Sequence, residues 1–175
     1  IYPLTDFLGA VPGYFEYDIS GWFLAFILIF FGIIFGDGGY GLLVTIVALI
    51  MMLKAKMKGG KISPLLGLVT LVGFATVVWG AVTCTWFGFT PEQLPQWVKN
   101  LSIPVISNVY ADTIWQLPWT KEGVGLTTAQ NMQIFCFALA LFQLSVAHIK
   151  GIKSNLGSLK VLGEVGALMQ LWGLF

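Results

Sequence analysis

The most constraining feature of this sequence is a stretch of 33 residues, 21–53, in which Asp37 is the only charged residue. At a rise of about 1.5 Å per residue, one continuous helix of this length would reach about 50 Å, which exceeds a hydrocarbon core about 30 Å thick. Two interpretations fit: one strongly tilted helix, or two shorter helices over 22–35 and 40–53 joined by a turn. We favour the two helices, because glycine permits positive φ angles and because a turn places the acid near water. The predicted turn contains Gly36, Asp37, Gly38 and Gly39, with Gly41 two residues later.

The composition indicates an integral membrane protein. Of the 175 residues, 57% are hydrophobic and only 10% are charged, and the mean hydropathy is +0.86. Soluble globular domains carry about 25% charged residues, so that class is excluded. Long uncharged runs are expected where several helices satisfy their backbone hydrogen bonds inside lipid. The predicted fold is all-α, a polytopic transmembrane helix bundle with an N-terminal helical hairpin.

Three further apolar segments predict spans over 64–89, 130–149 and 159–175. The last segment is shorter than the about 20 residues that a full span needs. The sequence also begins with Ile1 and lacks the features of a secretory signal. We therefore expect this sequence to be a piece of a larger protein.

Two lysine loops, 54–61 and 150–160, predict the orientation in the membrane. Basic loops are retained in the cytoplasm, and two predicted spans separate these loops, so both are expected on the cytoplasmic side. The connection 90–129 is then expected outside, where its tryptophans and tyrosine suit the membrane interface. Residues 91–101 within it are expected to form a short helix at the membrane surface.

Small and polar residues recur at spacings of three and four in the later spans, which predicts one protein-facing stripe on each helix. We favour bundle packing as their role, and a solute or ion path past Gln133 or Gln143 stays the alternative. The stripes are Gly73, Thr76, Gly80 and Thr83; Gln133, Cys136, Ala140, Gln143 and Ala147; and Gly163, Gly166, Gln170 and Gly173.

Three ionisable residues are candidates for a site. Asp37 is an intramembrane acid by sequence, which suggests ion binding or a proton relay, but we favour a structural role in which it caps backbone amides. His148 and Glu164 occur at matching depths at the ends of neighbouring spans. We hypothesise a polar contact between them, and the alternative is that each extends separately to the headgroups.

The sequence predicts no catalytic residues, no metal site and no cofactor. It has a single histidine and no phosphate-binding loop, nucleophile elbow or CxxC motif. Nine lysines are balanced by eight acids without any arginine, so no nucleic-acid partner is expected.

The segment FFGIIFGDGGYGLL, 30–43, resembles the signature of the membrane domain of the V-type ATPase a subunit, called subunit I in prokaryotes. Three further segments agree with the family in order and spacing. They are VWGAVTCTWFG, FQLSVAHIKGI and LKVLGEVGALMQLWGLF, and the last two resemble prokaryotic members.

The resemblance implies a membrane stator subunit of a rotary ATPase, which supports proton or sodium translocation against a rotor ring of proteolipids. It implies other V-type ATPase subunits and the lipid bilayer as partners and a prokaryotic plasma membrane as location. The sequence departs from the family in having no arginine. We therefore expect 1–175 to be a partial C-terminal membrane domain, non-catalytic in itself, without the N-terminal cytoplasmic domain and the last helices. The alternative function is an independent secondary transporter with a discontinuous helix at 36–41.

Overall fold

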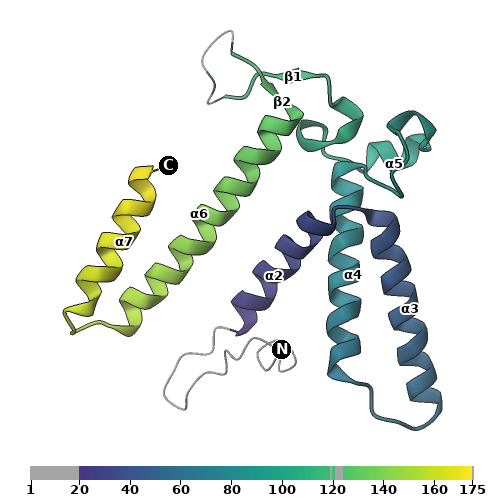
Figure 1. Cartoon of the computed structure of the whole chain (residues 1–175), viewed down its shortest axis with the longest axis horizontal. Coiled ribbons are helices and arrows are strands. Elements are labelled where there is room, and N and C mark those ends of the chain that lie inside the picture. The colour runs from purple at the N-terminus through teal and green to yellow at the C-terminus, as the bar shows by residue number, and fades with distance from the viewer. Residues whose placement is uncertain (1–19, 119, 121–123, 175) are drawn as a thin grey trace. The chain divides into compact units, whose positions relative to one another are not determined.

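The computed structural model describes residues 20–118, 120 and 124–174, and it confirms the predicted all-helical class (Figure 1). The chain divides into two compact units, Ile1–Thr128 and Ala129–Phe175, which are described separately. Among the described residues, three helices are long and apolar enough to cross a membrane: α3 (Gly38–Met57), α4 (Pro64–Thr83) and α6 (Thr128–Ser154). α2 (Ser20–Phe35) is apolar but has only 16 residues, about 24 Å of helix.

In the first unit, α4 packs against both α2 and α3. The helix breaks after Phe35, where the chain turns, so the long apolar stretch is two helices. Figure 1 shows that α2 and α3 diverge from this turn. The packing partner of both helices is therefore α4, and the turn joins two helices that meet a common third one.

The helix ends in this unit follow from local chemistry. α2 ends where Gly36 takes a φ of 61°, and α4 starts with Pro64, whose fixed φ suits the first turn. α4 ends at Thr83, since Cys84 adopts the left-handed conformation with a φ of 57°. The apolar run predicted that this helix would continue to residue 89. An apolar run alone gives no signal for such a termination.

The connection after α4 is a folded cap of short elements. It contains η1 (Pro91–Gln93), α5 (Gln96–Asn100), η2 (Pro104–Ile106), η3 (Asn108–Tyr110) and the antiparallel strands β1 (Ile114–Trp115) and β2 (Leu126–Thr127). The expected surface helix over 91–101 is thus two short helical turns, with Val98 buried and Trp97 exposed. The Ile103 N–H donates to the Val82 carbonyl at 2.9 Å and joins the cap to the end of α4.

The second unit contains most of α6 and, after a short loop, α7 (Lys160–Leu174). The stripe of small residues that was predicted on α7 is exposed. A Cβ atom built on Gly163, Gly166 or Gly173 would meet no atom within 4 Å among the described residues. The stripe on α4 behaves differently, because all four of its members, Gly73, Thr76, Gly80 and Thr83, are buried.

Candidate functional site

The turn between α2 and α3 consists of Gly36 and Asp37 alone. Gly36 donates to the Gly32 carbonyl at 2.8 Å, which closes α2, and Asp37 has the extended backbone of an N-cap residue, with φ −111° and ψ 113°. Gly38, Gly39 and Gly41, predicted to form or flank the turn, lie in the first turn of α3. They belong to the helix because Asp37 caps it one residue earlier.

The carboxylate of Asp37 accepts four backbone hydrogen bonds from two segments, one directly after it in the chain and one about 50 residues later. Within α3 it accepts from Gly39 at 2.8 Å and from Tyr40 at 3.2 Å, as N-cap residues do. Beyond α4 it accepts from Phe87 at 3.0 Å and from Gly88 at 3.2 Å. A carboxylate bonded in this way has few free lone-pair sites, and it joins the start of one helix to the end of another.

The segment after α4 presents its amides through unusual backbone angles. Cys84, Phe87 and Gly88 have positive φ angles of 57°, 50° and 70°. The Gly38 N–H donates to the Thr85 carbonyl at 2.9 Å, which adds a direct main-chain link beside the carboxylate. Non-glycine residues rarely adopt positive φ, so the hydrogen bonds to Asp37 and α3 offset a conformational cost.

Glycines let α3 and α4 approach closely just behind this carboxylate. A Cβ on Gly80 would overlap the backbone of Gly38, and a Cβ on Gly41 would lie 2.8 Å from the Cβ of Thr76. Neither glycine tolerates a larger residue without movement of the helices. This seam, formed by Gly38, Gly41, Gly73, Thr76 and Gly80, sets the distance at which Asp37 reaches the loop beyond α4.

The acid and its glycines were predictable from the sequence, whereas the segment that donates to Asp37 from beyond α4 was not. Phe87 and Gly88 lie in the VWGAVTCTWFG segment, which was assigned to the end of a helix. Apart from the glycine after two aromatic residues, this segment gives no signal that its amides are free to donate. A backbone N–H donor occurs at almost every residue and is not marked by any side chain, so this partner can be identified only from the fold.

The second candidate pair lies on α6 and α7. His148 Nδ1 is 2.7 Å from Glu164 Oε2, and their side chains are 28% and 33% exposed. Glu164 also lies over Gly151, where a Cβ atom would come within 2.8 Å of the carboxyl carbon. A hydrogen bond of 3.0 Å from Trp172 Nε1 to Ser145 Oγ also joins these helices.

In the described part of the chain, no group of three or more histidine, cysteine, aspartate or glutamate side chains is arranged to hold a metal ion. Cys84 and Cys136 are both free thiols. Gln133 is exposed and Gln143 is half-buried on α6. The arrangement around Asp37 therefore offers tight main-chain bonding and no cluster of ionisable side chains.

Comparison with known proteins finds relatives that are named subunit I of V-type and A-type ATP synthases. The chain is 38% identical to V-type ATP synthase subunit I 1 of Treponema pallidum over 175 residues, which is 100% of the chain and 26% of that protein. It is 29% identical over 177 residues to V-type ATP synthase subunit I of Borreliella burgdorferi, covering 99% of the chain and 26% of that protein. A-type ATP synthase subunit I of Methanocaldococcus jannaschii is 27% identical over 155 residues, covering 83% of the chain and 22% of that protein.

The chain thus spans about a quarter of the length of the curated relatives that it matches. No family model matches the sequence, and no solved structure matches it.

Proposed function

The chain belongs to the family of V-type and A-type ATP synthase subunit I, and from this premise we propose that it is a bracing part of the membrane stator of a rotary ATP synthase. In this role it supports proton or sodium translocation against a rotor ring of proteolipids and carries out no catalytic step. Its partners are then the ring, the other subunits of the complex and the lipid bilayer.

The observation that supports bracing is the fourfold bonding of the Asp37 carboxylate. A stator must hold its helices against the torque of a rotor, so the joints between its helices must resist separation. Asp37 links the first turn of α3 to the loop beyond α4, and the glycine seam behind it lets the two helices contact through their backbones. Close backbone approach and main-chain hydrogen bonds are the interactions that hold helices together in lipid.

The same geometry argues against the alternative of a secondary transporter. A discontinuous helix that binds substrate exposes its free helix ends near the bilayer midplane. Here the carboxylate oxygens and the nearest amides bond to one another, beside residues 85–88 that follow the end of α4. The break therefore lies at an end of α4 and not at its middle.

We further propose that the lysine loops 54–61 and 150–160 lie on the cytoplasmic side of a prokaryotic plasma membrane. The support is the positive-inside rule, together with the two predicted spans that separate the loops and so place both on the same side. In the first unit, loop 54–61 and the Asp37 turn lie at opposite ends of α3, so the Asp37 turn then faces the outside.

We also propose that His148 and Glu164 tie α6 to α7. The distance of 2.7 Å suits a hydrogen bond, and it becomes an ion pair when the imidazole is protonated. A Cβ atom built on Gly163, Gly166 or Gly173 would meet no atom within 4 Å among the described residues, so these glycines give no close backbone contact, and the Trp172–Ser145 hydrogen bond is a second polar link between the same helices.

The test is co-purification of the full-length subunit from membranes with an affinity tag. We expect the proteolipid of the rotor ring and the ATP-hydrolysing subunits to co-purify. We expect Asp37→Ala to lower ATP-driven ion uptake by reconstituted vesicles more than it lowers ATP hydrolysis, because a loosened stator uncouples the two. The matched control is Asp112→Ala, since Asp112 is exposed in the cap. A tagged subunit that purifies without ring or ATPase subunits would show that the stator assignment is wrong.

A further inference from the structure

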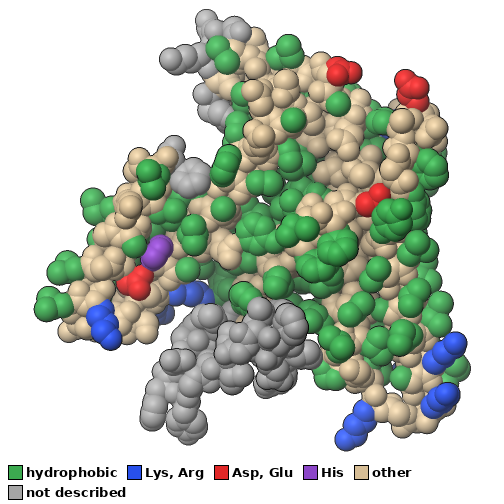
Figure 2. All heavy atoms as spheres, in the orientation of Figure 1, with side chains coloured by type: hydrophobic (Ala, Val, Ile, Leu, Met, Phe, Trp, Pro, Cys, Tyr) green, Lys and Arg blue, Asp and Glu red, His purple; other side chains and the backbone are tan. Residues whose placement is uncertain are grey.

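Four lysines gather at the end of the α3–α4 pair that lies away from Asp37. Lys54 and Lys56 are in the last turn of α3, Lys58 follows it as the C-cap and Lys61 precedes α4. All four are exposed, and within the part of the chain that the structure describes none of them takes part in an ion pair. Figure 2 shows lysine side chains on the surface at this end. No carboxylate occurs in the sequence between Asp37 and Glu92, so this end of the pair carries uncompensated positive charge.

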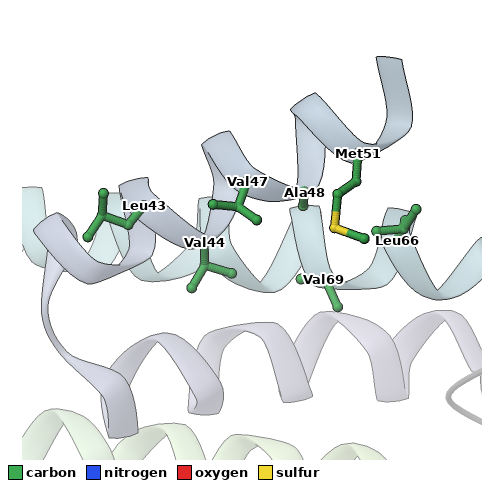
Figure 3. A pocket seen from close by; sticks show the side chains of 7 residues that line it. All are labelled: Leu43, Val44, Val47, Ala48, Met51, Leu66 and Val69. Carbon is green, nitrogen blue, oxygen red and sulfur yellow. The ribbon is translucent and has the colours of Figure 1, made fainter. Parts of the chain in front are cut away.

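An apolar hollow lies between α3 and α4 (Figure 3). Met51, which lines it, precedes Lys54 by three residues on α3. Its lining includes Val44, Val47, Ala48 and Met51 from α3 and Leu66 and Val69 from α4. Ala48 is buried at the hollow, and its small side chain leaves room between the two helices. Val47 and Met51 are 56% and 51% exposed and lie at the rim of the hollow. Such a hollow on a membrane-spanning pair is open to lipid chains.

The hollow and the lysines share one face of α3. Val47, Met51 and Lys54 follow each other at spacings of four and three residues, which aligns them along a single helix face. The 20 residues of α3 measure about 30 Å, which matches the hydrocarbon thickness. The last turn of α3 therefore reaches the headgroup level, where the lysine ammonium groups meet lipid phosphates.

From this alignment we propose that the α3–α4 pair holds an anionic phospholipid, with an acyl chain in the hollow and the phosphate on the lysines. An anionic lipid such as phosphatidylglycerol carries a net negative charge, which the lysines attract. Zwitterionic phosphatidylcholine has no net charge, and its quaternary ammonium group is repelled by the same lysines. The site does not depend on the proposed stator role or on which leaflet faces the lysines.

The experiment uses the full-length subunit in bilayers and spin-labelled lipids, whose protein-bound fraction is measured by electron paramagnetic resonance. We expect phosphatidylglycerol to be preferred over phosphatidylcholine about fivefold or more. Replacing Lys54, Lys56, Lys58 and Lys61 together by glutamine should bring the ratio close to one, and replacing them by arginine should preserve it. Raising the salt concentration should reduce the preference, because exposed charges are screened. An unchanged preference in the glutamine variant overturns the proposal, as does equal loss in the arginine variant.

A second pair of variants tests the hollow. Val47→Trp fills it from the exposed rim without touching a lysine, and we expect it to reduce the bound fraction of phosphatidylglycerol severalfold. Val78→Trp is the matched control, because Val78 is 46% exposed on α4 and does not line the hollow. Equal effects of the two variants would overturn the placement of the acyl chain.

Two further outcomes separate other ligands of the lysines. Displacement of the lipid by millimolar inorganic phosphate would mean that the lysines bind a free anion, contrary to the proposal. A glutamine variant that keeps its lipid preference but no longer assembles with other subunits would assign the lysines to a protein contact, and the lipid proposal would be wrong.

Discussion

The carboxylate of Asp37 accepts a hydrogen bond of 3.0 Å from the backbone N–H of Phe87, 50 residues later in the chain. The same oxygen caps α3 through Gly39 and Tyr40. One side chain thus performs a local task, starting a helix, and a long-range task, fixing the loop beyond α4.

Asp37→Ala should destabilise the subunit by about 2–4 kcal/mol, because it removes an N-cap and two charge-assisted hydrogen bonds to the distant loop. Asp37→Asn keeps one acceptor oxygen and should cost less. The measurement is the thermal unfolding of the full-length subunit in detergent. Asp112→Ala should leave the midpoint unchanged, and a similar midpoint for all three variants would contradict the role of Asp37.

Gly80→Ala should destabilise the α3–α4 pair by about 1–3 kcal/mol, because its methyl group would overlap the backbone of Gly38. Gly67→Ala on the same helix is the matched control, since a Cβ there meets nothing within 4 Å. Alanine is the better helix former, so this control should be neutral or stabilising by up to about 1 kcal/mol. Equal loss of stability in both variants would show that the seam does not limit the packing.

The His148–Glu164 contact should give a coupling energy of about 0.5–1 kcal/mol in a double-mutant cycle of His148→Gln and Glu164→Gln. The value is small because both side chains are about a third exposed and solvent screens them. Additive single effects would indicate that the two residues act separately.

Trp172→Phe should lower the stability of the α6–α7 pair by about 1 kcal/mol, because it removes the indole N–H that donates to the buried Ser145 hydroxyl. Trp97→Phe is the control, since Trp97 is 67% exposed in the cap. Adding Ser145→Ala to Trp172→Phe should cost little more than either change alone. Full additivity would show that the hydrogen bond does not contribute.

Much of this architecture was predictable because lipid imposes simple rules on sequence. The helix break at Asp37 followed from the length of one uncharged stretch, and the stripe of Gly73, Thr76, Gly80 and Thr83 is the buried face of α4. Their matching depths suggested a contact between His148 and Glu164, and the structure has His148 Nδ1 2.7 Å from Glu164 Oε2. The stripe on α7 was equally regular, but its glycines face open space among the described residues. Spacing identifies a small-residue face and does not identify its partner.

The sequence by itself determined that the chain is a helical membrane protein that turns at a glycine-flanked acid, because hydrophobic length and charge limit what a bilayer accepts. Only the tertiary structure decided that α4 is the common partner of α2 and α3, and that the amides of Phe87 and Gly88 meet Asp37. The physical reason is that backbone N–H groups are alike at every residue. Their partners depend on which segments the fold brings together, and these segments cannot be identified from composition or periodicity.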